Sequence, residues 1–148
     1  MRKVLVFTLV IMFFALFSSV NAQSYKTGVG VRFSNNDAII GTGISVKHFV
    51  SGSTALEAIL SFDPVALGVL AEKHKPTKAQ GLYWLYGGGA YVPFEGRNKF
   101  GALGILGLDY KFTDLPINVT LDWKPELYLI NRVDFEPAAV GVSVRFAF

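Results

Sequence analysis

The sequence predicts an all-β fold: an eight-stranded antiparallel up-and-down transmembrane β-barrel, preceded by a cleaved signal peptide. Three observations lead to this prediction. The chain ends on Ala138–Phe148, in which apolar residues alternate with small or polar ones up to the last residue. It begins with two basic residues and an apolar run. Between these ends lies a series of alternating segments separated by turn residues.

The N-terminal segment predicts a secretory signal peptide over residues 1–22. Val4–Phe17 is an uncharged apolar run of 14 residues, and Val20 and Ala22 occupy the −3 and −1 positions of a cleavage site. The run is shorter than the about 20 residues of a transmembrane helix, so a retained anchor is the weaker alternative. We expect cleavage after Ala22, which leaves one barrel domain over residues 23–148.

Composition narrows the function classes. Removing the signal peptide removes two basic residues and no acidic ones, so the net charge falls from +3 to +1 and no nucleic-acid partner is expected. The chain has 51% hydrophobic residues, yet its mature part lacks an apolar stretch near 20 residues. A β-barrel distributes its apolar band over every second residue in this way. With no Cys, the chain offers no disulfide, thiolate metal site or cysteine nucleophile.

Eight alternating segments account for the mature chain. Clusters of Asn, Asp, Gly, Pro and Ser separate them, which is the chemistry of turns. Most segments reach the about 9–11 residues with which a tilted strand crosses a bilayer. The predicted segments are Tyr25–Ser34, Ile39–Val50, Thr54–Phe62, Val65–His74, Leu82–Phe94, Phe100–Phe112, Ile117–Leu129 and Ala138–Phe148.

An even number of strands places both termini at one end of the barrel, which in outer-membrane barrels is the periplasmic end. At that end we expect the turns Ser51–Ser53, Lys75–Gly81 and Thr113–Pro116. At the extracellular end we expect the short connections Asn35–Asp37, Asp63–Pro64, Glu95–Lys99 and Asn131–Pro137. Because these connections are short, large surface-binding loops are not expected.

The seventh segment, Ile117–Leu129, defines the two faces most clearly. One face carries polar residues from Asn118 onward, and the other is apolar apart from Pro125. The polar faces of the chain are rich in small residues such as Gly43 and Gly141, which suit a narrow lumen. The bulky faces carry no charge along their spans, as a lipid-facing surface requires. A lipocalin-like barrel with its apolar face inside is the alternative.

The same alternation assigns five basic and five acidic residues to the interior. An uncompensated buried charge costs several kcal/mol, whereas a balanced set can pair. Since eight strands leave an interior just wide enough for side chains to fill, we expect a closed, salt-bridged interior and no open pore. Glu72 and Glu126 are the first candidates to lie in solvent instead. The ten residues are Arg32, Lys47, Glu57, Glu72, Asp109, Lys111, Asp122, Lys124, Glu126 and Arg145.

Aromatic and glycine residues add three local expectations. The fifth segment is bulky on both faces before Gly87-Gly88-Gly89, which predicts a bulge or a glycine kink. The apolar positions of the last strand are expected to act as a barrel-assembly signal; they are Val144, Phe146 and Phe148. Aromatic residues near strand ends predict an interfacial girdle, formed by Trp84, Tyr110, Phe112 and Trp123.

Residues 107–127, with the terminal Val142–Phe148, resemble small outer-membrane β-barrel proteins found in Bacteroidota. The similarity covers the mature chain and is most specific over residues 107–127. More broadly, the chain is similar to eight-stranded barrels of the OmpA and OmpX type, without the periplasmic domain of OmpA. The resemblance implies the architecture and an outer-membrane location in a Gram-negative cell, and it implies no defined activity.

Residues that could carry chemistry argue against an enzyme. His48 falls on the predicted outer face and His74 lies by a turn, and neither has a Ser partner and an acid by strand parity, as an esterase would need. Scattered His and carboxylate residues give no metal-ligand spacing, so no cofactor is expected. Lys73, Lys75 and Lys78 form a basic cluster at a turn that is either solvated or in contact with anionic headgroups.

The function we expect is a structural or interaction role in the cell envelope. The first alternative is a narrow pore or transporter for small or apolar solutes, and the second is a lipid-modifying enzyme. The expected partners are outer-membrane lipid and, during biogenesis, the barrel-assembly machinery. A second outer-membrane protein is a further candidate partner.

Overall fold

A computed structural model describes residues 25–35, 38–95, 100–129 and 133–148. The predicted signal peptide and its cleavage after Ala22 lie outside these residues. Parts of three predicted connections, at residues 36–37, 96–99 and 130–132, lie outside them as well. No helix in the described ranges is long and apolar enough to cross a membrane.

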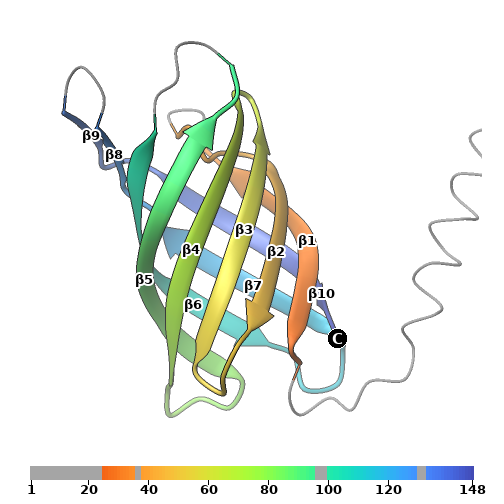
Figure 1. Ribbon diagram of the computed structural model, residues 1–148. Coiled ribbons are helices and arrows are strands. Elements are labelled where there is room, and N and C mark those ends of the chain that lie inside the picture. The colour runs from red at the N-terminus through yellow and green to blue at the C-terminus, as the bar shows by residue number, and fades with distance from the viewer. Residues whose placement is uncertain (1–24, 36–37, 96–99, 130–132) are drawn as a thin grey trace, which may run out of the picture.

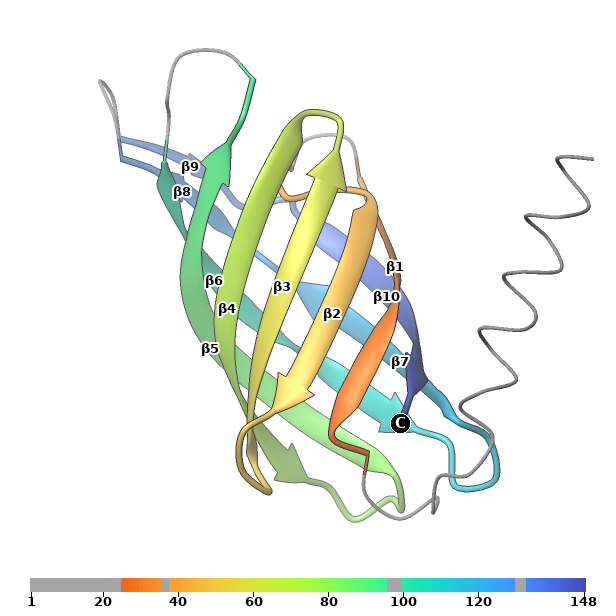
Figure 2. The same ribbon diagram turned by 45° about the vertical axis from the view of Figure 1, so that its right-hand side comes forward.

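The strands wrap into a closed antiparallel barrel, as predicted (Figures 1 and 2). They are β1 (Thr27–Ser34), β2 (Gly43–Phe49), β3 (Thr54–Phe62), β4 (Val65–Pro76), β5 (Leu82–Pro93), β6 (Gly101–Lys111), β7 (Ile117–Trp123), β8 (Glu126–Tyr128), β9 (Asp134–Glu136) and β10 (Val140–Ala147). From β1 to β7 each strand pairs with the next, and β10 pairs with both β7 and β1, which closes the ring. β7 and β8 pair with β6 one after the other, so together they occupy one strand position in the barrel wall. The closed wall therefore has eight strand positions.

Both ends of the described chain lie at the same end of the barrel, which we call the terminal end. Main-chain N–H groups of Lys26 and Thr27 donate to the Phe148 carbonyl at 3.0 and 2.9 Å. The β2–β3, β4–β5 and β6–β7 turns lie at this end too, and the described β3–β4 turn lies at the opposite, far end (Figure 1). This arrangement of the turns is the predicted one.

The second predicted segment, Ile39–Val50, is longer than the strand in the structure, because β2 begins only at Gly43. Residues 38–42 instead fold inward at the far end, where Ala38 and Ile40 are buried. The N–H groups of Ile39 and Ile40 donate to the Glu126 carboxylate at 2.9 and 2.7 Å. A carboxylate on another strand therefore replaces the ladder partners that a longer β2 would have had.

The seventh predicted segment is divided into β7 and β8 at Lys124 and Pro125. Pro125 has no N–H to donate, but its carbonyl still accepts a bond from Gly104 at 3.0 Å. The connection 131–137 was expected to be only a turn, yet it contains β9, which pairs with β8. The expectation was wrong because Phe135 lies opposite Leu127 and continues the sheet beyond the barrel wall.

The predicted bulge in β5 is absent from the described strand, because its register with β4 and β6 advances one residue at a time past Gly87–Gly89. The glycines allow close approach of neighbouring strands instead. A Cβ on Gly89 would lie 1.8 Å from the Val69 carbonyl oxygen, and one on Gly43 would lie 1.9 Å from that of Leu60. Strand curvature thus brings a neighbouring backbone to where a side chain would stand.

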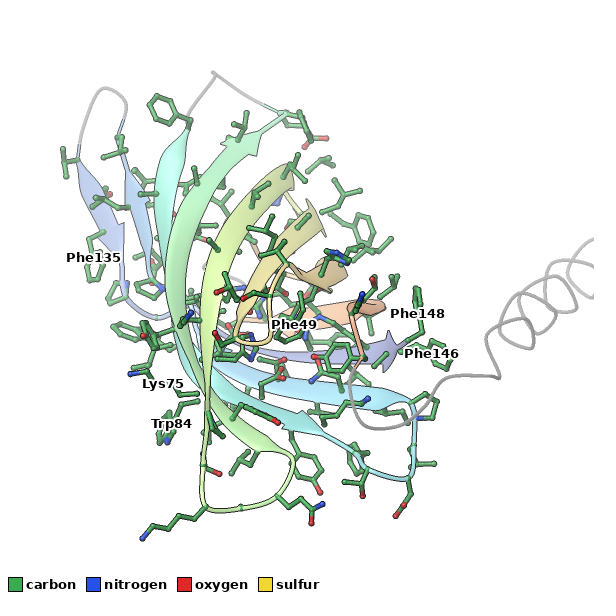
Figure 3. The ribbon with its side chains drawn as sticks, turned by 60° about the horizontal axis from the view of Figure 1, so that its bottom comes forward. Phe49, Lys75, Trp84, Phe135, Phe146 and Phe148 are labelled. Carbon is green, nitrogen blue, oxygen red and sulfur yellow. The ribbon has the colours of Figure 1, made fainter. Side chains whose placement is uncertain are left out.

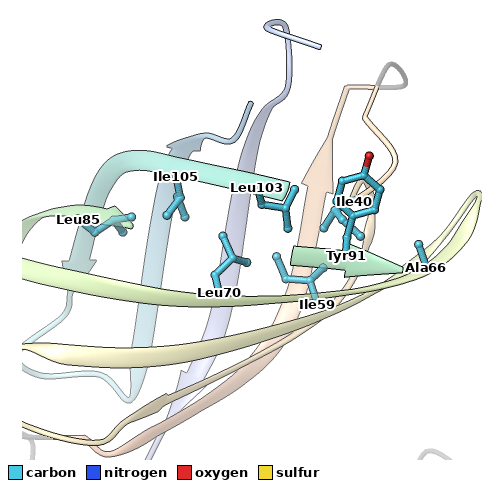
Figure 4. Close-up of a cluster of buried hydrophobic side chains, with 8 residues drawn as sticks. All are labelled: Ile40, Ile59, Ala66, Leu70, Leu85, Tyr91, Leu103 and Ile105. Carbon is cyan, nitrogen blue, oxygen red and sulfur yellow. The ribbon is translucent and has the colours of Figure 1, made fainter. Parts of the chain in front are cut away.

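Part of the interior is apolar, although the alternation predicted a polar one (Figure 4). An apolar cluster fills the β3–β6 side toward the far end, and residues 38–42 add Ile40 to it. At the positions of this cluster both faces of the strands are apolar, so alternation gives no contrast between inside and outside there. The apolar cluster consists of Ile40, Ile59, Ala66, Leu70, Leu85, Tyr91, Leu103 and Ile105.

The outer surface is apolar on every long strand. On β1, for example, Val29, Val31 and Phe33 are exposed, while Arg32 between them is completely buried. Other exposed large side chains include Ile44, Val46, Leu56, Leu60, Leu67, Val69, Trp84, Tyr86, Leu106, Leu121, Trp123, Val140, Val142 and Val144. The usual distribution of polar and apolar residues in a water-soluble domain is therefore inverted.

Candidate functional site

The interior holds a network of charged side chains. Of the ten charged residues assigned to the interior by alternation, the structure buries all except Lys111. His74, which is 4% exposed, lies among them. The nine buried members are Arg32, Lys47, Glu57, Glu72, Asp109, Asp122, Lys124, Glu126 and Arg145.

Arg145 of β10 is the most connected member. Its guanidinium forms an ion pair with Glu57 and donates to Ser45 Oγ at 2.7 Å, Thr120 Oγ1 at 2.7 Å and Asn118 Oδ1 at 3.1 Å. Ser45 Oγ in turn donates to Glu57 at 2.7 Å. The planar guanidinium offers five donors in a fixed fork, so one side chain joins β10 to β2, β3 and β7 across the lumen.

A second group lies closer to the terminal end. Lys47 Nζ is 2.8 Å from Glu72 Oε2 and 3.6 Å from Asp109 Oδ1. His74 Nε2 is 3.1 Å from the same Glu72 oxygen, and its Nδ1 is 3.8 Å from Asp109 Oδ2. Two carboxylates thus share one ammonium and one imidazole.

Thr120 and Asn118 of β7 connect the two groups. The Thr120 hydroxyl donates to Asp109 at 2.6 Å while it accepts from Arg145. The Asn118 amide donates to Asp109 at 2.9 Å, and its oxygen accepts from Arg145. Satisfying donors and acceptors in this way is what makes buried charge tolerable.

A third group lies toward the far end. Arg32 Nη1 and Asp122 Oδ2 are 2.6 Å apart, and Lys124 Nζ is 3.6 Å from Glu57 Oε2. Gly141 makes room for this pair, since a Cβ there would lie 2.4 Å from Arg32 Nη2. Small residues on the inner face therefore accommodate large charged ones from neighbouring strands.

Three placements differ from the expectations. Glu72 and Glu126 were expected to be the first to lie in solvent, but both are buried. Lys47 forms an ion pair with Glu72, and main-chain N–H groups donate to Glu126. His74 was placed by a turn, yet β4 continues to Pro76 and turns His74 inward on the same face as Glu72. Strand parity with Glu72 could have identified it.

Lys111 lies on the inner face of β6 but outside the buried network. It is only partly buried, at the terminal end, and its Nζ lies 4.6 Å from the centre of the Tyr25 ring. It was expected to pair with a carboxylate in the interior. An aromatic face takes that place because β6 ends here, beyond the last inward carboxylate, Asp109.

The residues predicted for the aromatic girdle lie on the outer face. Trp84 and Tyr110 are exposed near the terminal end, where Phe112 packs against Tyr110 with ring centres 4.8 Å apart. Trp123 is the last residue of β7, away from the terminal end, and its indole N–H donates to the Pro137 carbonyl at 2.5 Å.

The residues of the predicted assembly signal also lie on the outer face. Val144 is exposed, and Phe146 and Phe148 point outward beyond it with ring centres 6.1 Å apart (Figure 3).

The histidines form no catalytic triad within the described ranges. His48 is exposed and its Nδ1 lies 2.9 Å from Thr27 Oγ1, whereas His74 contacts carboxylates and no Ser hydroxyl. The described residues also hold no group of three or more His, Cys, Asp or Glu residues that could bind a metal ion. What the arrangement of charges can do is hold the strands together across the lumen.

Comparison with known proteins relates the fold to one solved structure. No protein-family model and no curated protein matches the chain. The chain is similar to the crystal structure of the N-terminal β-barrel domain of Pseudomonas aeruginosa OprF, with a TM-score of 0.60 and 15% identity, over 84% of this chain and 98% of that one. The likeness is one of fold: a closed, eight-stranded antiparallel barrel of the kind found in an outer-membrane protein.

Proposed function

We propose that this protein is a small integral outer-membrane β-barrel protein with a closed, charge-paired interior and a structural or interaction role in the cell envelope. One observation carries the proposal: Arg32, Lys47 and Arg145 are buried inside the barrel while its outer face is apolar. In water such a surface would be a very large apolar patch. Facing hydrocarbon, the same surface is favourable, and the inward charges avoid lipid.

The similarity to the OprF barrel domain supports the same location. In this proposal residues 1–22 direct export and are removed after Ala22, the terminal end faces the periplasm, and the far end faces the outside. Membrane lipid covers the outer face, and the barrel-assembly machinery recognises Val144, Phe146 and Phe148 during biogenesis. A second outer-membrane protein is the candidate partner in the membrane, and we propose no catalytic activity.

Membrane insertion can be tested with Asp122→Ala, which leaves Arg32 buried without its carboxylate. We expect the full chain, produced in a Gram-negative host, to float with outer membranes and to migrate as a heat-resistant barrel on unboiled gels. Asp122→Ala should lose that migration, while Asp114→Ala, at an exposed turn, should keep it. Recovery of the processed protein as a folded monomer in detergent-free buffer would contradict the proposal.

The closed interior can be tested by conductance. Ion pairs join side chains of β1–β4, β6, β7 and β10 across the lumen, and the apolar cluster fills the β3–β6 side, so side chains occupy the space that an open channel would need. We expect no discrete single-channel steps from the protein in a planar bilayer. Reproducible steps would favour the narrow pore instead.

A further inference from the structure

The terminal end of the barrel opens into a cavity of about 790 Å³. It reaches from the exposed rim down to buried members of the charge network. Tyr25, Phe49 and Tyr83 supply aromatic walls, His74 lies at the buried end, and Lys26 and Lys111 lie at the rim. Its volume falls within the range of small-molecule sites, which are about 300–1,000 Å³.

A continuous row of rings leads into this cavity. Tyr25 and Phe49 meet edge to face with ring centres 5.2 Å apart, and Phe49 lies 4.8 Å from the His74 ring. In the view from this end Phe49 lies within the circle of strands, whereas Trp84, Phe146 and Phe148 point out of it (Figure 3). The wall therefore offers flat apolar surface that lipid does not cover.

The charge at the rim favours an anion. Lys111 forms no ion pair with the described residues and lies over the Tyr25 ring, and Lys26, which is exposed, also lines the cavity. The carboxylate that lines the cavity, Asp109, already accepts bonds from Asn118 and Thr120. The Lys26 N–H donates to the Phe148 carbonyl, whereas Lys111 Nζ lies over the Tyr25 ring that lines the cavity, so Lys111 is the better placed cation.

Two buried polar atoms in the wall also lack hydrogen-bond partners. They are His74 Nδ1, on a side chain that is 3% exposed, and the Tyr25 hydroxyl. Tyr25 precedes β1. Burial raises the pKa of its hydroxyl above the usual range, so this group stays a neutral donor at physiological pH. Unpaired buried polar atoms are costly, and a ligand that reached them would recover part of that cost.

We propose that this cavity is a binding site for a small amphipathic anion, a molecule with one carboxylate or similar head and a flat apolar body. Lys111, with Lys26 at the outer margin, binds the head. Tyr25, Phe49 and Tyr83 contact the body, and His74 marks its inner limit. The site opens at the terminal end and meets the charge network only at its inner limit, where His74 and Asp109 line it, so the proposal goes beyond the structural role above.

Binding can be measured on the detergent-solubilised protein by NMR titration of backbone amides. The probes are 2-naphthoate, the neutral 2-naphthylmethanol and the cationic 2-naphthylmethylammonium. We expect saturable shifts near Tyr25, Phe49 and Lys111 with naphthoate, and clearly weaker binding of the other two probes. Lys111→Gln should weaken naphthoate binding about tenfold, which corresponds to the loss of one hydrogen bond to a charged group. Binding of the neutral probe should stay unchanged.

Lys73→Gln is the matched control, because Lys73 belongs to the same end of the barrel but lies outside the cavity and bonds to Thr54 Oγ1. It should leave naphthoate binding unchanged. Lys26→Gln, at an exposed position, should cause a smaller loss and gives a second variant if Lys111→Gln alters folding. Equal binding of the three probes, shifts confined to the outer face, or full affinity in the Lys111→Gln protein would overturn the proposal.

Discussion

The two parts of the barrel interior are closed by opposite chemistry. Around Arg145 the lumen is filled by ion pairs and directed hydrogen bonds, whereas around Leu70 it is filled by apolar side chains without directional contacts. The boundary runs within single strands: on β4, Leu70 and Glu72 are successive inward residues, one in each part. A narrow barrel can thus be closed by either chemistry, provided that the volumes match.

The two parts should respond differently to damage. Removing one member of a buried ion pair leaves its partner charged and unpaired, while removing an apolar side chain leaves a cavity. The charged part should therefore be the more sensitive to single substitutions and the easier to rescue by paired ones.

The largest effect is expected for Arg145→Met. The substitution leaves Glu57 without its guanidinium and removes the donor to Thr120 and Asn118. We expect a loss of about 3–5 kcal/mol in the free energy of unfolding. Urea titration in lipid vesicles, followed by the fluorescence of Trp84 and Trp123, measures it.

The double variant Arg145→Met with Glu57→Leu serves as the control. It removes both charges of the Arg145–Glu57 pair and should recover part of the lost stability. The recovery is partial because Lys124 loses its carboxylate when Glu57 is replaced. If the double variant were as unstable as the single one, packing of the Arg145 side chain would explain the loss better than its charge.

A smaller effect is expected for Leu70→Ala in the apolar cluster. The truncation leaves a cavity within this cluster, and we expect a loss of about 2–4 kcal/mol in the same assay. Leu67→Ala is matched to it, because Leu67 lies on the outer face of the same strand. In the proposed membrane location lipid chains can fill the space left there, so equal losses for the two variants would contradict a packed interior.

The smallest effect is expected for Glu126→Gln, at the edge of the apolar cluster. Gln has only one acceptor oxygen for the N–H groups of Ile39 and Ile40, so one hydrogen bond to a charged group is lost. We expect this loss to lower the free energy of unfolding by about 1–2 kcal/mol. Hydrogen exchange of these two amides should become faster in the variant. Glu95→Gln, at an exposed far-end position, should leave the exchange unchanged.

Alternation predicted the barrel well where the two faces differ in polarity. β1, β7 and β10 carry charged or small residues on one face and bulky apolar ones on the other, so a single orientation leaves no charge in lipid. The prediction failed where the contrast is missing. On β5 and the far-end half of β6 both faces are apolar, and the interior there was expected to be polar.

Local sequence also could not place residues whose partners are distant in the chain. Residues 39–42 belong to the second predicted segment, but their position depends on Glu126, which is 86 residues away from Ile40. His74 lies next to turn residues, and only the pairing of β4 with β3 and β5 turns it into the lumen.

By itself, the order of residues determined the eight positions of the barrel wall, their up-and-down sequence and, where the two faces differ in polarity, which groups turn inward, because side chains in a strand alternate with a period of two. Which charge meets which, where the interior becomes apolar and where a cavity remains at the terminal end were decided by the tertiary structure. The reason is that closing the ring sets the stagger between strands, and this stagger brings Arg145 to Glu57, 88 residues away.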